Sequence, residues 1–260
     1  MGGVRIAGTT FWITGASGGI GAELANELQR RGGRLAISAR RREALEDVSQ
    51  GRMHVEPVDI TDRDAVHTAV ESVRAALGNI DVAVLNAGTW RQVSIDNFDA
   101  EAFRMQFDTN LMGNVHCIEA LLPTMLQNKS GVITGMASVA GYRGLPGSEA
   151  YGSSKAALIN LLESLRGSLG PRGIRVQTIS PGFVKTDLTA RNKFPMPFII
   201  DADKAARIIA DGIAAEKTEI VFPLPMMLLM KSARFVPNVL WPKLFARTPM
   251  ARGAAGLRKG

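Results

Sequence analysis

The sequence predicts an α/β fold: a single doubly wound parallel sheet of about seven strands with helices on both faces. Short apolar runs rich in β-forming residues alternate with longer helix-forming segments from residue 10 to residue 222. A glycine-rich turn joins the first of these runs to the first helical segment. The length of 260 residues, with 46% hydrophobic and 21% charged residues, suits a globular domain with a large core.

Seven runs have the composition of strands. They span 10–13, 35–39, 53–58, 80–85, 132–136, 174–179 and 219–222. The expected helices span 22–31, 62–77, 99–127, 150–169 and 201–215. Asp62 and Asp201 stand where N-caps are expected, and Gly170-Pro171 ends the fourth helix. Strands that alternate with helices indicate a parallel sheet covered on both faces.

The turn after the first strand reads Thr14-Gly-Ala-Ser-Gly-Gly-Ile-Gly21. Glycines between a strand and a helix let the backbone approach a pyrophosphate, and the helix N-terminus supplies amides and a positive dipole end. The spacing is Gly-x-x-x-Gly-x-Gly rather than the commoner Gly-x-Gly-x-x-Gly. The pattern indicates a phosphate-binding loop, with a purely structural turn as the alternative.

Arg40 follows the second strand, 19 residues after Gly21, where an NAD site would place an acidic residue. A carboxylate there would bind the ribose 2′-hydroxyl, whereas a guanidinium suits a 2′-phosphate. With Arg41 beside it, Arg40 favours NADP(H) over NAD(H); a basic helix start is the alternative.

Tyr151 and Lys155 form a Tyr-x-x-x-Lys pair at i and i+4 of an expected helix, and Ser138 precedes the Tyr by 13 residues. A phenol has a pKa of about 10, which a nearby ammonium lowers. Such a pair suits proton exchange with a carbonyl or alcohol oxygen, which Ser138 could also hold. The alternative is a half-buried Tyr and a solvated Lys on an ordinary helix.

Composition excludes several classes of function. The three histidines are scattered without ligand-like spacing, so no metal is expected. A single cysteine, Cys117, forbids an internal disulfide, fits a reducing cytoplasm, and is interpreted as inert core. No signal peptide, myristoylation motif or membrane span is expected. The net charge is +7, but the excess of basic residues lies after residue 219, and residues 1–219 are neutral overall. This distribution argues against nucleic-acid binding by residues 1–219.

Taken together, these motifs resemble the short-chain dehydrogenase/reductase family over residues 10 to 222. The resemblance rests on the glycine loop 14–21, Asn86-Ala87-Gly88, Asn110, Ser138, Tyr151-x-x-x-Lys155 and Pro181-Gly182 with Thr186, in the family's order and approximate spacing. It implies a Rossmann-like sheet and hydride transfer between a nicotinamide and a carbonyl or secondary alcohol. It also favours a homo-oligomer.

The resemblance assigns roles to four catalytic residues. Tyr151 would be the general acid in reduction and the general base in oxidation. Lys155 would lower the pKa of Tyr151 and bind the nicotinamide ribose. Ser138 would orient the substrate oxygen, and Asn110 would hold a water in a proton relay.

The resemblance implies a cofactor-binding set along the strand ends. Its members are Gly15, Ser17, Gly18, Gly19, Ile20, Gly21, Arg40, Arg41, Asp59, Ile60, Asn86, Ala87, Gly88, Tyr151, Lys155, Pro181, Gly182, Val184 and Thr186. An apolar substrate would contact Ser138, Tyr151, Trp90, Tyr142 and Phe183.

Residues 223–260 are expected to form an extension to a catalytic domain spanning 1–222. Helices are expected at 226–235 and 238–246, and residues 220–260 contain seven basic residues and no acidic one. Three roles stay open for this segment: a lid over the substrate cleft, a subunit contact, or peripheral binding to a membrane surface through 223–250. An extension of this character is closer to family members that act on lipophilic carbonyls.

The sequence therefore predicts an NADP(H)-dependent oxidoreductase that interconverts a carbonyl and a secondary alcohol of an apolar substrate. One alternative is an NAD-dependent alcohol dehydrogenase. The other is a non-catalytic NADP-binding sensor that acts through its tail. The expected location is the cytoplasm, or its membrane surface if the tail binds lipid.

Overall fold

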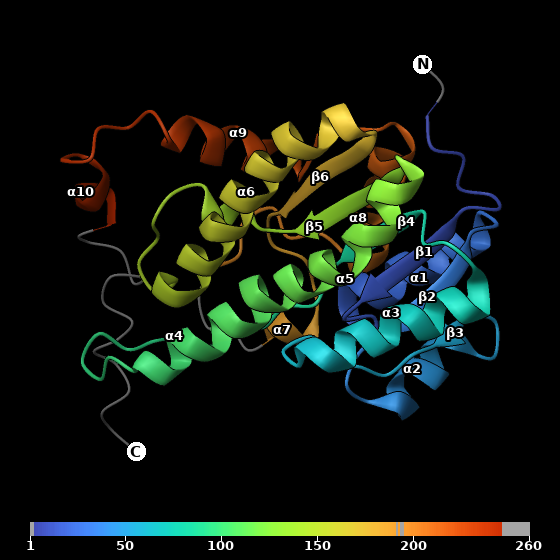
Figure 1. Cartoon of the computed structure of the whole chain (residues 1–260). Helices are drawn as coiled ribbons and strands as arrows, with labels where there is room; N and C mark the ends of the chain where they lie inside the picture. Colours follow the sequence, from blue (N-terminus) through green and yellow to red (C-terminus); the bar gives the residue numbers. More distant parts are fainter. Residues whose placement is uncertain (1–2, 191, 193–194, 246–260) are drawn as a thin grey trace.

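A computed structural model describes residues 3–190, 192 and 195–245. Its seven strands form one parallel sheet in the order β3-β2-β1-β4-β5-β6-β7. The strands are β1 (Thr10–Thr14), β2 (Arg34–Ser38), β3 (His54–Val55), β4 (Val82–Leu85), β5 (Gly131–Met136), β6 (Ile174–Pro181) and β7 (Glu219–Phe222). The predicted Rossmann-like, doubly wound fold is confirmed (Figure 1).

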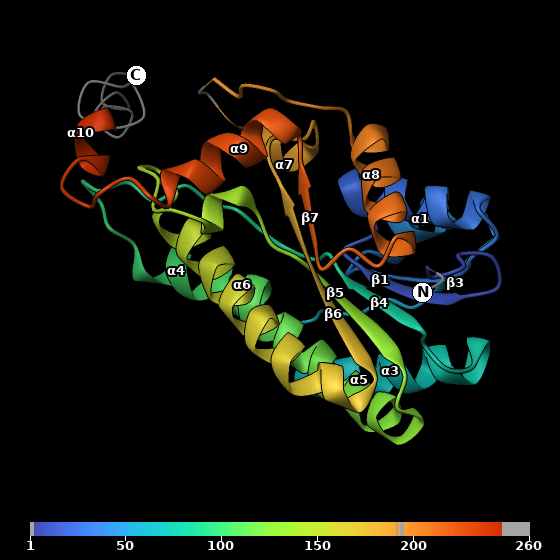
Figure 2. The same cartoon turned by 90° about the horizontal axis from the view of Figure 1, so that it is seen from above.

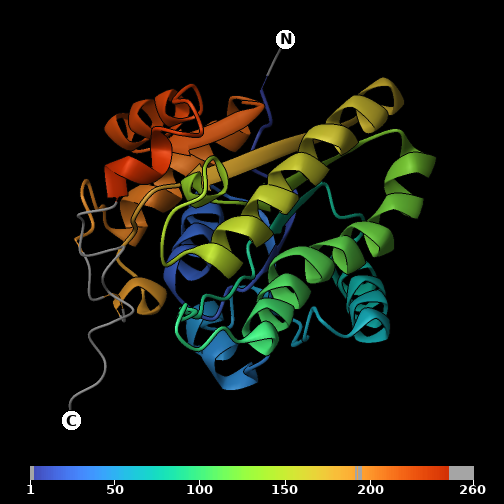
Figure 3. The ribbon, with the colours of Figure 1, turned by 90° about the vertical axis from the view of Figure 1, so that its left-hand side faces the viewer.

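Helices cover both faces of this sheet (Figure 2). They are α1 (Gly19–Arg30), α2 (Arg42–Ser49), α3 (Arg63–Leu77), α4 (Ala100–Phe107), α5 (Gly113–Asn128), α6 (Glu149–Leu169), α7 (Asp187–Ala190), α8 (Ala202–Ala214), α9 (Leu224–Ala233) and α10 (Trp241–Phe245). Helices α3, α5 and α6 lie on one face, and α1 and α8 lie on the other (Figures 1 and 2). Long α5 and α6 run beside each other along the outside (Figure 3).

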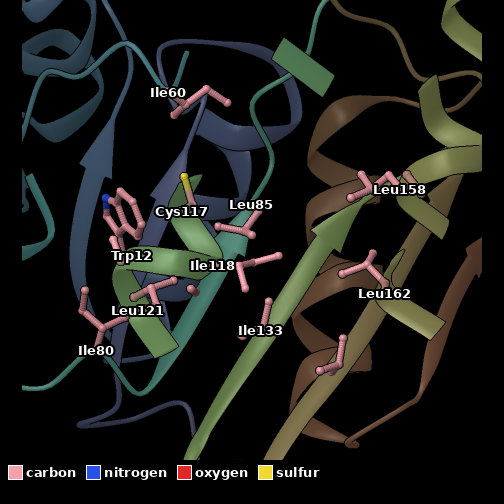
Figure 4. Close-up of a cluster of buried hydrophobic side chains, with 14 of the residues drawn as sticks. Trp12, Ile60, Ile80, Leu85, Cys117, Ile118, Leu121, Ile133, Leu158 and Leu162 are labelled. Atoms are coloured by element: carbon pink, nitrogen blue, oxygen red, sulfur yellow. The ribbon is translucent and has the colours of Figure 1, made fainter. Parts of the chain in front are cut away.

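Each face buries its own hydrophobic core. Figure 4 shows the core under α3, α5 and α6, where Trp12, Cys117 and Leu158 are fully buried. The indole nitrogen of Trp12 donates a hydrogen bond to Ser38 Oγ at 2.8 Å, so its one polar atom is satisfied inside the core. Burial raises the pKa of the Cys117 thiol to about 12, which agrees with an inert core residue.

The structure differs from the predicted elements in the third strand and in the long central helix. The strand predicted over 53–58 is reduced to His54–Val55, although Glu56 and Val58 still donate backbone hydrogen bonds to Ile37 in β2 and to Ala39 just after it. Pro57 lies between these two donors on an edge strand, where its missing N–H removes no bond to β2. The helix predicted over 99–127 is divided into α4 and α5 by a π-helical turn, Asp108–Met112.

Both predicted N-cap positions are confirmed, but only Asp62 caps its helix with its side chain. Asp62 Oδ1 accepts a hydrogen bond from the backbone N–H of Ala65 at 3.0 Å. Asp201 occupies the N-cap position of α8, but its side chain makes no capping bond. It forms an ion pair with Lys185 instead, with Nζ and Oδ1 2.8 Å apart.

The tail forms two helices at the β7 end of the molecule, opposite β3 (Figures 1 and 2). The helix predicted over 226–235 is observed as α9, and the one predicted over 238–246 is represented by the shorter α10. Residue 246 and the basic residues Arg247, Arg252, Arg258 and Lys259 lie outside the described residues, as does Phe194 of the proline-rich loop. No helix in the described part of the chain is long and apolar enough to cross a membrane.

Candidate active site

The carboxyl ends of the parallel strands open into one cleft of about 860 Å³. Its lining residues come from the segments that follow β1, β2, β3, β4, β5 and β6, and from α4 and α6. This is the edge where doubly wound sheets bind ligands. The glycine turn and the helix that carries Tyr-x-x-x-Lys both line this cleft.

The glycine turn is held against the end of β4. Gly15 has a φ of +67°, and a Cβ at this position would lie 2.6 Å from Ala87 Cα. Asn86 Nδ2 donates hydrogen bonds to the backbone oxygens of Thr14 and Gly15, both at 3.0 Å. Thr14 Oγ1 in turn accepts from the amides of Asn86 and Ala87, both at 3.1 Å. Glycine at 15 is therefore required by backbone conformation and by contact, and Thr14 is a supporting residue that the sequence analysis missed.

The N-terminus of α1 is available to an anion. Gly18 is the N-cap residue, no described side chain caps the helix, and the first turn contains no acidic residue. A Cβ on Gly18 would meet no described atom within 4 Å, so the turn is open on the cleft side. Unpaired amides at an uncapped helix N-terminus suit a phosphate group. The residues of this turn therefore fit the pyrophosphate of a dinucleotide.

Arg40 and Arg41 line the cleft at the end of β2 with exposed side chains. Neither arginine forms an ion pair with any other residue in the described ranges, whereas neighbouring Arg42 lies 3.7 Å from Glu46. Asp59 lines the cleft from the end of β3, where its Oδ1 accepts hydrogen bonds from the amide and hydroxyl of Thr61. Two free guanidiniums beside a dinucleotide-sized cleft fit a phosphate on the adenosine ribose.

Tyr151 and Lys155 lie one helical turn apart on α6 and both line the cleft. Lys155 is 2% exposed, and its Nζ lies 5.7 Å from the centroid of the Tyr151 ring. The ammonium donates a hydrogen bond of 2.7 Å to the backbone oxygen of Met136 at the end of β5. This bond fixes the lysine beside the cleft floor.

Burial shifts both pKa values toward the neutral forms. It lowers the pKa of Lys155 to about 8 and raises the pKa of Tyr151, where a hydrogen bond with Ser138 acts in the opposite direction. The pKa of Tyr151 is therefore raised rather than lowered as expected, because burial is the largest cause and only Ser138 opposes it. The phenol stays protonated, as a proton donor to a carbonyl oxygen must be.

Ser138 is positioned by the turn that follows β5. It is the N-cap of a 3-10 turn, Val139–Gly141, and its Oγ accepts a hydrogen bond from the amide of Ala140 at 3.2 Å. Its hydroxyl donates to Pro181 O at 3.5 Å, and both Ser138 and Tyr151 line the cleft. The two hydroxyls can therefore bind the same substrate oxygen.

Asn110 is fully buried in the π-helical turn and is not among the cleft-lining residues. Its Oδ1 accepts from the amide of Thr89 at 2.8 Å, and its Nδ2 donates to Thr89 O and to Ser154 Oγ, both at 3.0 Å. Ser154 Oγ also donates to Tyr151 O at 2.8 Å. The side chain therefore joins the end of β4 to the catalytic helix. Ser154, which the sequence analysis missed, completes the link.

The structure brings together every residue of the predicted cofactor-binding set. Three of the predicted substrate contacts, Trp90, Tyr142 and Phe183, are not among the described residues that line the cleft. Tyr142 is 8% exposed in the core, and its hydroxyl donates to Glu219 Oε1 at 2.5 Å. Phe183 packs against the same core, and Trp90 adjoins Thr89, whose backbone is held by Asn110.

The cleft has further walls on α4, the π-helical turn and α7. Helix α4 and the π-helical turn contribute Glu101, Arg104, Met105, Asp108 and Thr109, and α7 contributes Asp187, Leu188 and Thr189. These residues lie on elements whose position depends on tertiary packing, so no local pattern marks them. Exposed Leu188 and Met105 are the large apolar side chains among them.

The fold and the cleft define a nucleotide-binding oxidoreductase, and comparison with known proteins gives its family. A family model described as short chain dehydrogenase matches residues 9–195. The chain is 40% identical over 238 residues to an uncharacterized oxidoreductase of Myxococcus xanthus, covering 89% of this chain and 94% of that protein. The protein belongs to the short-chain dehydrogenase family.

Solved structures agree with this assignment. A short-chain dehydrogenase from Streptomyces avermitilis superposes with a TM-score of 0.80 at 25% identity, covering 94% of this chain and 98% of that one. A short chain dehydrogenase from Burkholderia cenocepacia, solved in complex with NADP, gives a TM-score of 0.81 at 27% identity and covers 93% and 99% of the two chains.

Proposed function

We propose that this protein transfers a hydride between NADP(H) and the carbonyl or secondary alcohol carbon of an apolar substrate. The observation that carries the cofactor preference is the pair of unpaired, exposed guanidiniums of Arg40 and Arg41 at the cleft end of β2. A carboxylate at this position would repel a 2′-phosphate, whereas arginine forms strong bonds with one. The NADP complex of the Burkholderia relative supports the same preference.

A bound nicotinamide would supply or accept the hydride. The residues of this chain would bind the cofactor and the substrate and would exchange the proton with the substrate oxygen. The uncapped α1 terminus and the glycine turn would hold the pyrophosphate, and Arg40 and Arg41 the 2′-phosphate. Asp59 and Ile60 would line the adenine end, and the 181–186 segment the nicotinamide end. Lys155 would bind the nicotinamide ribose.

Tyr151 would act as the general acid in reduction and the general base in oxidation. In reduction, its hydroxyl would give a proton to the carbonyl oxygen as the hydride reaches the carbonyl carbon, which produces the alcohol. Ser138 would hold that oxygen, since it lines the cleft together with Tyr151. Asn110 and Ser154 would be positioning residues that fix α6 against the end of β4.

The test is Tyr151→Phe, which removes one hydroxyl and preserves the ring. We expect NADPH binding within about twofold of the wild type and a fall in kcat of about a thousandfold or more, because general acid–base catalysis contributes typically 10²–10⁴-fold. Ser153→Ala on the exposed side of the same helix is the matched control and should retain full turnover. Full turnover by Tyr151→Phe would disprove the mechanism, and NADPH binding without turnover of any carbonyl or alcohol by the wild type would favour a sensor.

A further inference from the structure

Helix α9 has two apolar faces. Met226, Met230 and Ala233 are buried and follow one side of the helix. Leu224 is 62% exposed, Leu228 56% exposed and Phe235, just beyond the helix, 87% exposed. Their spacing of four and seven residues places these three on the side opposite the buried face. The helix is therefore packed on one side and presents a second apolar stripe outward.

Further exposed apolar side chains lie beside the stripe on α9 and on the chain that follows it. Val239, Leu240 and Leu244 are exposed after the helix, and Leu229 is exposed on the flank of α9. Of the 13 large hydrophobic side chains that are exposed in the described residues, seven lie between residues 224 and 244. We call these seven the tail patch: Leu224, Leu228, Leu229, Phe235, Val239, Leu240 and Leu244. A concentration of this kind is typical of an interaction surface rather than of scattered surface residues.

The charge around the tail patch has one sign. Arg234 and Lys243 are exposed within it, and residues 220–260 contain seven basic residues and no acidic one. An isologous contact between two copies of the chain would bring these basic residues face to face. A surface that is apolar and anionic would instead satisfy both features. Anionic lipid bilayers have this combination, with acidic headgroups above an apolar interior.

The tail patch is fixed to the catalytic cleft by the inner side of α9. Met226 packs against Gly182, which lines the cleft, so closely that a Cβ there would lie 2.8 Å from Met226 Cγ. Lys231 forms an ion pair of 2.5 Å with Glu219, which also accepts the hydrogen bond of Tyr142. The outward stripe therefore lies on the far side of a helix whose inner side packs against a residue of the cleft wall.

The chain beyond α9 is bound to the loop that follows Ser138. Arg143 donates hydrogen bonds to Val236 O at 3.0 Å and to Asn238 Oδ1 at 2.8 Å. Trp241 Nε1 donates to Gly144 O at 2.6 Å, and Arg143 lies 5.3 Å from the Trp241 ring. This part of the tail patch is therefore attached to the loop beside the proposed catalytic serine.

We propose that the tail patch docks the protein onto an anionic membrane surface. Its apolar side chains enter the headgroup region while Arg234 and Lys243 meet acidic lipid headgroups. The residues 223–260 are accordingly an extension with a function separate from that of the 1–222 catalytic domain. On the basis of the function proposed above, a substrate dissolved in the bilayer would reach the cleft beside α9 without crossing bulk water.

Vesicle co-sedimentation tests the docking independently of catalysis. Wild-type protein is mixed with phosphatidylcholine vesicles, or with vesicles that also contain phosphatidylglycerol, without cofactor or substrate. We expect binding to the mixed vesicles that is at least about tenfold tighter than to phosphatidylcholine alone, because each Lys or Arg near an anionic surface adds about fivefold. Raised salt should weaken this binding.

The variant L228S/L229S/F235S removes three exposed apolar side chains and retains every charge and the buried residues Met226, Met230 and Ala233 of α9. We expect its affinity for mixed vesicles to fall at least about a hundredfold, since each of these side chains contributes about tenfold or more when buried. I95S is the matched control, because Ile95 is 60% exposed but lies outside the tail patch. It should bind vesicles as the wild type does. An unchanged NADPH affinity verifies that the triple variant is folded.

Two outcomes would overturn the proposal. The first is a wild type that sediments with neither kind of vesicle, or a triple variant that sediments as well as the wild type. The second is a wild type that binds no vesicles and is an oligomer in analytical ultracentrifugation, together with a triple variant that is a monomer. That result would make the tail patch a subunit contact. Neither outcome affects the proposed oxidoreductase activity, which is measured without lipid.

Discussion

The buried ammonium of Lys155 should make the stability of this protein depend on pH in a way that one substitution isolates. Lys155 is 2% exposed, and burial lowers its pKa from the usual 10.5 to about 8. Replacement by Met retains most of the side-chain volume and removes the titrating amine. Below about pH 8 the folded and unfolded chains both carry the charge, so the folded wild type bears the full desolvation cost.

The sign follows from which state loses its proton first. Between about pH 8 and 10.5 the folded wild type is neutral at Lys155 while the unfolded chain remains protonated. Stability rises with pH wherever the unfolded state binds more protons. The free energy of unfolding of the wild type should therefore increase over this pH range relative to that of the variant. The difference between the two pKa values corresponds to about 3 kcal/mol, of which about 2–3 kcal/mol should be realised by pH 10.

The assay is urea unfolding of the wild type and Lys155→Met at about pH 7 and about pH 10. The variant also leaves the Met136 carbonyl without its partner, at a cost of about 1–3 kcal/mol, but that cost is the same at both pH values. The free energy of unfolding of the variant is subtracted from that of the wild type at each pH. The change in this difference between the two pH values then reports the titration of Lys155 alone. A difference that does not change with pH would show that Lys155 keeps its usual pKa, which would refute the buried, desolvated site.

Three further substitutions test the supporting structure. Gly15→Ala should lower the free energy of unfolding by about 1–3 kcal/mol and abolish NADPH binding in a fluorescence titration, because it places a Cβ at positive φ against Ala87; normal binding would contradict the loop contact. Ser154→Ala should lower kcat about tenfold or more with the KM for NADPH nearly unchanged, because the hydroxyl fixes α6 rather than touching the reactants. Ser154→Thr keeps a hydroxyl and should therefore retain more activity than Ser154→Ala. Equal loss of activity in both variants would indicate a packing defect alone. Glu219→Gln should destabilise the protein at neutral pH: burial opposes the charged form, but Lys231 and Tyr142 outweigh it and hold the pKa of Glu219 below 4.5. The deficit should shrink as the pH falls below 4.5, and thermal unfolding that shows a constant deficit would exclude this origin.

The sequence was sufficient for the part of the site that follows from strand ends. Because the carboxyl ends of parallel strands lie on one edge, locating the strands also located the Gly15 turn, Arg40, Asp59 and Asn86. Even the third strand, which is much shorter than predicted, delivers Asp59 to this edge. Errors of a few residues in strand length do not move the edge.

Side-chain direction within loops could not be predicted in the same way. Tyr142 follows Ser138 closely in sequence, but it turns into the core because Glu219, 77 residues later, accepts its hydrogen bond. Asn110 was expected inside a helix, and its side-chain amide bonds with Thr89 and Ser154, which are 21 and 44 residues away in the sequence. The directions of both side chains depend on partners brought together only by the fold.

The pKa of Tyr151 shows the limit of reasoning from neighbours. Spacing alone places an ammonium one turn away and indicates a lowered pKa. The structure adds burial, which raises the pKa of Tyr151 and lowers that of Lys155. Desolvation depends on everything packed around the pair, so it has no local signature in the sequence.

The measurement that tests the central claim most directly is a titration of the purified protein with NADPH and NADH side by side. Intrinsic fluorescence of Trp12, Trp90 and Trp241 provides the signal, and Arg40→Ala is titrated in parallel. We expect the wild type to bind NADPH at least about tenfold more tightly than NADH. Arg40→Ala should lose most of this difference, because a charge-assisted contact is worth about 1.5–3 kcal/mol. Equal or tighter binding of NADH by the wild type would contradict this expectation and indicate NAD-linked alcohol oxidation.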